Sequence, residues 1–219
     1  MEFVHWFIDF FLHLDRHLAE IIAQYGVHTY TLLFVIVFCE TGLVVTPLLP
    51  GDSLLFAAGT FAALGSLDVW VLFWLLTVAA ILGDTVNYSI GRYVGPKVFD
   101  RPDSRWIKQA HLRRTQEFYD KYGGVTIIIG RFVPIVRTFA PFLAGVAGMS
   151  YRRFLSFNVV GAVAWITSLV YAGYLFGNIP WVKKNLSLIV VAIVIVSLIP
   201  AVTTFVGERR AARAQVPPQ

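Results

Sequence analysis

Three apolar segments constrain the fold of this chain more than any other feature of its sequence. They span residues 69–93, 154–177 and 186–206. Each approaches or exceeds the roughly 20 residues that a helix needs to cross the hydrocarbon core of a bilayer. Only 14% of the 219 residues are charged, whereas soluble domains carry about a quarter charged residues. We therefore predict an all-α polytopic membrane protein with about three full transmembrane helices.

Basic residues orient these helices. The tail, residues 208–219, contains Arg209, Arg210 and Arg213. Because the cytoplasmic loops of membrane proteins carry an excess of Lys and Arg, we expect this tail in the cytoplasm and predict that it is disordered. The stretch 94–124 mixes Lys and Arg with scattered apolar residues. By the same rule it is predicted to be a cytoplasmic amphipathic connector.

Residues 125–151 are mostly apolar, yet they cannot be a single crossing. They lie between the basic connector and the basic pair Arg152 and Arg153, so both of their ends belong on the cytoplasmic side. Pro134 and Pro141 interrupt any helix here, because proline lacks a backbone donor and clashes with the preceding turn. We therefore predict a re-entrant helical hairpin that dips to mid-membrane and returns.

Residues 27–66 follow the same pattern, with two apolar legs around a tip that contains Pro47, Pro50 and Gly51. If the helix over 69–93 runs from outside to inside, this hairpin enters the bilayer from the outside. The chain then consists of two inverted units, each a hairpin followed by a crossing. Transporters use this plan around a binding site near the bilayer midplane.

The N-terminal stretch 1–25 mixes charged residues with Phe, Trp and Leu, which is typical of an amphipathic interfacial helix. Together with the segments above it completes one membrane domain over residues 1–207. Tryptophans concentrate at membrane–water interfaces, so we interpret the six in this chain as interface anchors rather than cofactor contacts. They are Trp6, Trp70, Trp74, Trp106, Trp165 and Trp181.

Four charged residues lie at the predicted hairpin tips, Glu40 and Asp52 in the first hairpin and Arg131 and Arg137 in the second. A charged side chain in lipid costs at least about 2.5–3.5 kcal/mol, so such residues face partners or water. If the tips meet, the two arginines can neutralise the two carboxylates. The cluster is then either a structural ion-pair lock or a binding site, and broken backbone at membrane depth favours a site.

The residue types at the tips suit an anionic ligand. Arginine carries a permanently charged, planar guanidinium group that can bind a phosphate through two parallel hydrogen bonds. Arg131 and Arg137 are therefore candidate phosphate ligands. Carboxylates repel a phosphate when ionised and donate hydrogen bonds to it when protonated, so Glu40 and Asp52 are candidate proton-coupling residues. Asp84 is a further intramembrane acid, and its spacing places it on the same face of the predicted helix as Asn87, Tyr88 and Arg92. It is either a third proton-coupling residue or a polar residue hydrogen-bonded near a helix end.

Nothing in the sequence predicts a metal or another cofactor. The five histidines lack the spacing of metal ligands. The net charge of +5 is explained by the cytoplasmic loops, and no nucleic-acid motif accompanies it. The partners that we expect are therefore the bilayer, an anionic lipid and protons. Hairpins that cross only half of the membrane need neighbours to seal them, and a homodimer would supply such neighbours.

Four stretches of the sequence resemble the DedA family of bacterial inner-membrane proteins. They are "FCETGLVVTPLLPGDSLLFAAG", "GDTVNYSIGR", "GRFVPIVRTFAPFLAGVAGMSYRRF" and "NVVGAVAWITSLVYAGYLFG". The resemblance covers nearly the whole chain. It implies a fold with two opposed re-entrant hairpins, shared with eukaryotic lipid scramblases of the VTT-domain type.

The resemblance also implies a function. It implies transport of undecaprenyl phosphate across the bacterial inner membrane, dependence on the proton-motive force and a role in envelope integrity. The family's functional acids and arginines map onto Glu40, Asp52, Arg131 and Arg137. We therefore expect a flippase of a polyprenyl phosphate lipid and not an enzyme.

Two other functions remain open at this stage. Lipid-pyrophosphate phosphatases also use opposed re-entrant segments, and "PGDS" resembles one of their elements, but no Ser-Arg-Ser-like run or Ser-Gly-His triplet accompanies it. The other alternative is a proton- or cation-coupled antiporter of small solutes that uses the same carboxylates.

Overall fold

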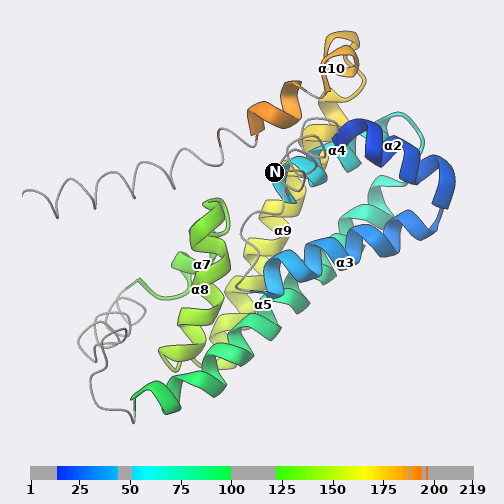
Figure 1. Cartoon of the computed structure of the whole chain (residues 1–219). Coiled ribbons are helices and arrows are strands. Elements are labelled where there is room, and N and C mark those ends of the chain that lie inside the picture. Colours follow the sequence, from blue (N-terminus) through cyan, green and yellow to red (C-terminus); the bar gives the residue numbers. More distant parts are fainter. Residues whose placement is uncertain (1–13, 44–50, 100–121, 187, 194–195, 197–219) are drawn as a thin grey trace, which may run out of the picture.

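The computed structural model describes residues 14–43, 51–99, 122–186, 188–193 and 196, and in these residues it contains helices and no strand (Figure 1). The labelled helices are α2 (Leu14–Tyr25), α3 (His28–Gly42), α4 (Gly51–Ala63), α5 (Val69–Phe99), α7 (Val125–Gly130), α8 (Pro134–Val146), α9 (Tyr151–Phe176) and α10 (Pro180–Lys184). The predicted all-α class is therefore confirmed for this part of the chain.

Two of these helices are long and apolar enough to cross a membrane. They cover Val69–Gly95 within α5 and Tyr151–Phe176, which is α9. The α5 helix continues to Phe99, so the predicted connector 94–124 begins with helix, and its residues 100–121 lie outside the described residues. Most of the third predicted crossing, 186–206, also lies outside them. The span count therefore stays a prediction.

The two predicted hairpins correspond to two pairs of shorter helices, α3 with α4 and α7 with α8. Pro47 and Pro50 lie outside the described residues, whereas Gly51 is the first residue of α4. Pro134 opens α8, where a missing backbone N–H is tolerated. Pro141 lies inside that helix, so the prediction that it interrupts the helix is wrong. Re-entrant insertion of these pairs stays a prediction. The interfacial placement of the amphipathic helix 1–25, of which the structure describes α2, also stays a prediction.

The second leg of each hairpin packs on the long helix of the other half. In Figure 1, α8 lies beside α5, and these two helices are in close contact. The α4 helix packs in the same way against α9, and α3 packs against α5. The two halves of the chain are thus interlocked rather than side by side, which brings the two hairpins into one core.

Glycines allow these helices to approach closely. A Cβ atom added at Gly173 on α9 would lie 2.0 Å from the backbone oxygen of Phe56 on α4. A Cβ atom at Gly91 on α5 would lie 2.1 Å from the backbone oxygen of Phe142 on α8. Small residues at such positions drive the packing of helices in membranes, where lipid is as apolar as the side chains.

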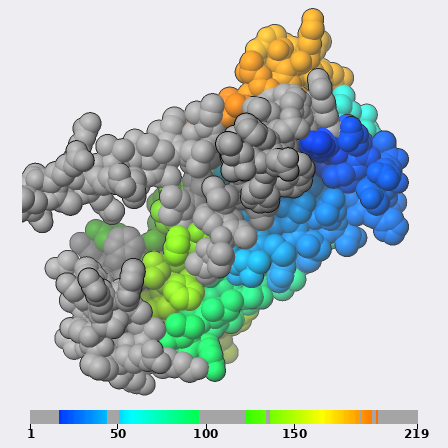
Figure 2. Space-filling view, in the orientation of Figure 1, coloured from blue at the N-terminus to red at the C-terminus, as the bar shows by residue number. Residues whose placement is uncertain are grey.

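Apolar side chains fill the interior and also cover part of the outside. The main core gathers residues of α3, α4, α5 and α9, including Leu33, Val37 and Ile166. On the outside of α5, large apolar residues recur about every four positions, as expected for a face in contact with lipid. They are Trp70, Trp74, Val78, Leu82, Val86 and Ile90. Figure 2 shows α3 and part of α5 at the surface of one face of the molecule.

We predict that Gly173→Ala destabilises the protein because it forces α4 and α9 apart. Overpacking a tight interface costs about 1–3 kcal/mol of the free energy of unfolding. Thermal unfolding in detergent measures the effect. Gly161→Ala in the same helix is the matched control, since its Cβ atom would lie 3.4 Å from the nearest atom, an ordinary contact. Equal unfolding temperatures for both variants would contradict the close α4–α9 packing.

Candidate functional site

Five ionisable side chains that the sequence singled out gather in the interior, and they come from different helices. They are Glu40, Asp52, Asp84, Arg131 and Arg137. Glu40 is near the end of α3, Asp52 is in the first turn of α4, and Asp84 is in the middle of α5. Arg131 follows α7 directly, and Arg137 lies in α8. We call these five residues the charged cluster.

Arg137 connects the two hairpins. Its Nη2 donates a hydrogen bond to Glu40 Oε1, and its Nη1 donates one to Asp52 Oδ1 over 2.8 Å. Glu40 is fully buried, and the Asp52 side chain is 17% exposed. One guanidinium of the second hairpin therefore holds both carboxylates of the first.

Gly51 supports this arrangement through its backbone. Its N–H donates to Glu40 Oε1 over 3.0 Å, so the N-terminus of α4 helps to satisfy the buried carboxylate. A Cβ atom at this position would lie 1.9 Å from Glu40 Oε2. The predicted tip residue Gly51 is thus required for close approach to Glu40.

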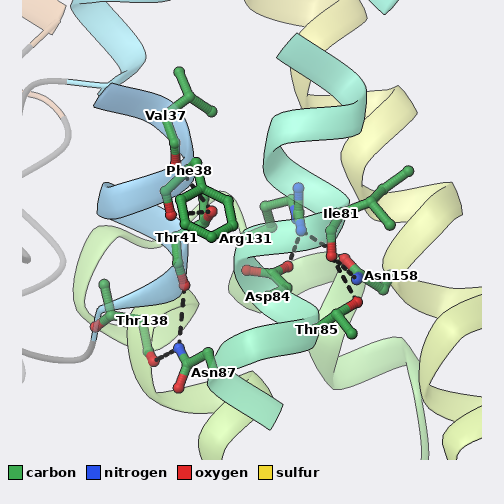
Figure 3. Close-up of polar contacts among 10 residues, drawn as sticks. All are labelled: Val37, Phe38, Thr41, Ile81, Asp84, Thr85, Asn87, Arg131, Thr138 and Asn158. Atoms are coloured by element: carbon green, nitrogen blue, oxygen red, sulfur yellow. Dashed lines mark hydrogen bonds and ion pairs between the residues drawn. The ribbon is translucent and has the colours of Figure 1, made fainter. Parts of the chain in front are cut away.

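Arg131 has a different set of partners from the one that we expected. Its Nη2 donates to Asp84 Oδ2 and, over 2.7 Å, to Asn158 Oδ1 (Figure 3). The sequence predicted that both arginines would neutralise the acids of the first hairpin, but Arg131 pairs with Asp84 instead. The physical reason is the packing of α7 on α9, which directs Arg131 toward the α5–α9 contact rather than toward α3.

Sequence reasoning missed two members of the site on α9, Asn158 and Trp165. Trp165 is 1% exposed, so the prediction that it anchors the chain at the membrane interface is wrong. Its Nε1–H donates to Asp52 Oδ1 over 2.9 Å. Its ring centroid lies 5.0 Å from the Arg137 guanidinium carbon and 5.7 Å from that of Arg131. The seven-residue spacing from Asn158, about two helical turns, is the signal that places both on one face of α9.

Asn87 joins the backbones that carry Glu40 and Arg137. Its Nδ2 donates to the Thr41 carbonyl over 3.2 Å and to the Thr138 carbonyl over 2.7 Å (Figure 3). These two carbonyls belong to the residues that directly follow Glu40 and Arg137. The amide of Asn87, which is fully buried, therefore ties both α3 and α8 to α5.

Tyr88 and Arg92 lie on the same predicted helical face as Asp84, and their hydrogen bonds are structural. The Tyr88 hydroxyl donates to the Met149 carbonyl. Arg92 Nη1 donates to both the Tyr88 hydroxyl and the Met149 carbonyl over 3.3 Å. These bonds hold the turn between α8 and α9 against α5 and lie apart from the charged cluster.

The charged cluster contains hydrogen-bonding capacity that its own members do not use. Three buried atoms of the cluster have no hydrogen-bond partner among the described residues, namely Glu40 Oε2, Arg131 Nη1 and Arg137 Nε. Buried polar groups without partners are costly, so they mark places where a further group or a proton can be bound. In the described part of the chain, no three His, Cys, Asp or Glu side chains gather as metal ligands.

The fold and the site together define an α-helical membrane protein whose interior carries a mixed cluster of acids and arginines. The VTT domain family model matches residues 49–175, which include every member of the charged cluster except Glu40. The chain belongs to this family, in agreement with the resemblance to DedA proteins seen in the sequence.

Individual relatives support the same assignment. "Protein DedA" of Escherichia coli (strain K12) is 54% identical over 214 residues, which cover 97% of this chain and 98% of that protein. An uncharacterized membrane protein of Mycobacterium tuberculosis is 46% identical over 183 residues, covering 83% and 80% of the two chains. The inner membrane protein YghB of Escherichia coli is 34% identical over 184 residues, covering 82% and 79%. No solved structure matches significantly.

We predict that Asp84→Asn destabilises the protein by about 3–5 kcal/mol, because it leaves the buried charge of Arg131 without its counter-ion. The double variant Asp84→Asn with Arg131→Gln removes both charges. Its free energy of unfolding should fall by much less than the sum of the losses in the two single variants. Unfolding of all four proteins in detergent closes this double-mutant cycle. Additive losses would show that Asp84 does not act as the counter-ion of Arg131.

We predict that Asn87→Ala lowers the free energy of unfolding by about 1–3 kcal/mol, because two hydrogen bonds at about 0.5–1.5 kcal/mol each are lost. The control is Ser89→Ala, two residues along α5, where the exposed hydroxyl donates only to the Thr85 carbonyl of its own helix. Thermal unfolding distinguishes the variants. An Asn87→Ala variant as stable as the control would mean that α3 and α8 hold their places without this amide.

Proposed function

We propose that this protein transports a polyprenyl phosphate lipid across the bacterial inner membrane, driven by the proton-motive force. Undecaprenyl phosphate, returned for reuse in envelope synthesis, is the proposed substrate. The observation that carries the proposal is a pair of buried guanidiniums, on Arg131 and Arg137, each with an N–H that has no partner among the described residues. Arginine forks of this kind suit the tetrahedral oxygens of a phosphate.

The carboxylates provide a physical basis for proton coupling. Glu40 and Asp52 occupy two N–H groups of Arg137 that a phosphate would also need. A proton on either acid removes its negative charge. The protonated acid then binds Arg137 less strongly and no longer repels a phosphate. We propose that proton binding and phosphate binding therefore favour each other. Deprotonation then restores the carboxylate pairs and expels the phosphate.

Asp84 has a separate role in this scheme. Its pairing with Arg131 lies on the α5 side of the cluster, and Asn158 satisfies the same guanidinium from α9. We propose that Asp84 acts first as a counter-ion that keeps Arg131 in place while the protein is free of lipid. A proton-coupling role for Asp84 follows only if a phosphate displaces it.

The membrane supplies the rest of the proposed setting. The apolar outer face of α5 would contact the isoprenoid tail or other lipid while the phosphate enters the interior. We propose a multi-pass protein with a cytoplasmic C-terminus that works as a homodimer. Transport is favoured over phosphate-ester hydrolysis because the charged cluster consists of acids and arginines and includes no histidine nucleophile.

Reconstitution tests the proposal directly. In proteoliposomes with an imposed proton gradient, the wild-type protein should change the sidedness of undecaprenyl phosphate, and a protonophore should abolish this transport. The variant with Arg131→Ala and Arg137→Ala should lose at least tenfold in rate, since truncating a buried charged partner costs about 2–5 kcal/mol. The matched control is Arg152→Ala with Arg153→Ala, which removes two exposed arginines at the start of α9.

Three results would contradict the proposal. Unchanged transport by the variant with Arg131→Ala and Arg137→Ala would refute the assignment of the phosphate site to these two residues. Release of inorganic phosphate from a lipid pyrophosphate by the purified protein would instead favour a phosphatase. Proton flux in the absence of lipid, together with full activity of Arg137→Lys, would favour a small-solute antiporter, because lysine does not replace a bidentate fork.

A further inference from the structure

We propose that Trp165 is a positioning residue that holds both arginines of the site in the geometry that binds a lipid phosphate. This inference rests on the function proposed above and adds a residue to it. Trp165 comes from α9, whereas Arg131 is the first residue of the break between α7 and α8, and Arg137 lies within α8. A single indole thus faces two cations that no regular helix connects.

The two guanidiniums carry like charges, and the indole adds a second kind of partner to the carboxylates that pair with them. Both guanidinium carbons lie near the same indole, at 5.0 and 5.7 Å from its centroid. The face of an indole attracts cations within about 6 Å, and tryptophan is the strongest of the aromatic residues in this respect. Trp165 therefore offsets part of the repulsion and sets where each guanidinium can lie.

The indole differs from the other partners of Arg137 in one decisive way. Glu40 and Asp52 release their hold on Arg137 when they take up a proton or when a phosphate replaces them. The π face of Trp165 neither titrates nor competes for N–H donors, so it holds the guanidinium in both states. Without it, Arg137 would lose its orientation at the moment when the phosphate has to bind.

The indole N–H of Trp165 donates a hydrogen bond to the Asp52 carboxylate. Asp52 Oδ1 accepts hydrogen bonds from both Arg137 Nη1 and Trp165 Nε1, over 2.8 and 2.9 Å. When Arg137 turns to a phosphate, Asp52 therefore keeps its hydrogen bond from Trp165 and stays beside α9. Trp165 thus positions the arginines through its ring and the departing acid through its N–H.

The test measures the affinity of each variant for undecaprenyl phosphate in lipid nanodiscs, together with its thermal unfolding. Trp165→Leu removes the π face next to both guanidiniums and should weaken binding about tenfold. Trp165→Phe keeps a π face and should stay within about threefold of the wild type. Should Trp165→Leu fail to fold, Trp165→Met carries the same expectation, because the longer, unbranched methionine side chain adapts to the space that the indole leaves.

Phe154→Leu is the matched control. Phe154 is also fully buried on α9, and its ring stacks on Tyr88 at a centroid distance of 4.2 Å, within the smaller apolar cluster. This variant should lower the unfolding temperature and leave lipid affinity unchanged. Equal affinity of Trp165→Leu and Trp165→Phe, or a Trp165→Leu variant that binds like the wild type, would overturn the inference.

The same assay separates this inference from the proposed function. If the Arg131→Ala, Arg137→Ala variant binds the lipid as tightly as the wild type does, the phosphate site itself is refuted, and the role of Trp165 with it. If that variant loses binding while Trp165→Leu does not, the site stands and only the role of Trp165 is refuted.

Discussion

The contact of Arg137 with Glu40 and Asp52 is the interaction on which the rest of the structure depends. It joins α8 to α3 and α4, so a single side chain connects the two interrupted hairpins. Removing charges from water costs several kcal/mol per ion unless partners are in place. The three helices must therefore meet with the correct register before any of these groups can be buried at tolerable cost.

Stability alone does not account for such a cluster. A buried ion pair is often no more stable than well-packed apolar residues of similar volume. Apolar packing already links α3, α4, α5 and α9 through a large core, and glycines bring α4 onto α9 and α8 onto α5. We therefore propose a chemical role for the acids and arginines at the centre of this packing, in which they bind and release protons and an anion while the surrounding helices keep their places.

Sequence reasoning found the members of the charged cluster because an ionisable residue in an apolar run is costly and therefore conspicuous. It did not find their pairing. Whether Arg131 meets Glu40 or Asp84 depends on the interlocked packing of the two halves, which no local pattern encodes. Trp165 was missed for a related reason, since an indole that anchors a helix at the interface looks the same in sequence as one buried under two guanidiniums.

An experimental structure with undecaprenyl phosphate bound would test the central claim most directly. We predict the phosphate within hydrogen-bonding distance of both Arg131 and Arg137, with the bond between Arg137 and Asp52 broken and Trp165 still facing the two guanidiniums. A phosphate bound only at the exposed Arg152 and Arg153, with Arg137 still held by Glu40 and Asp52, would contradict it.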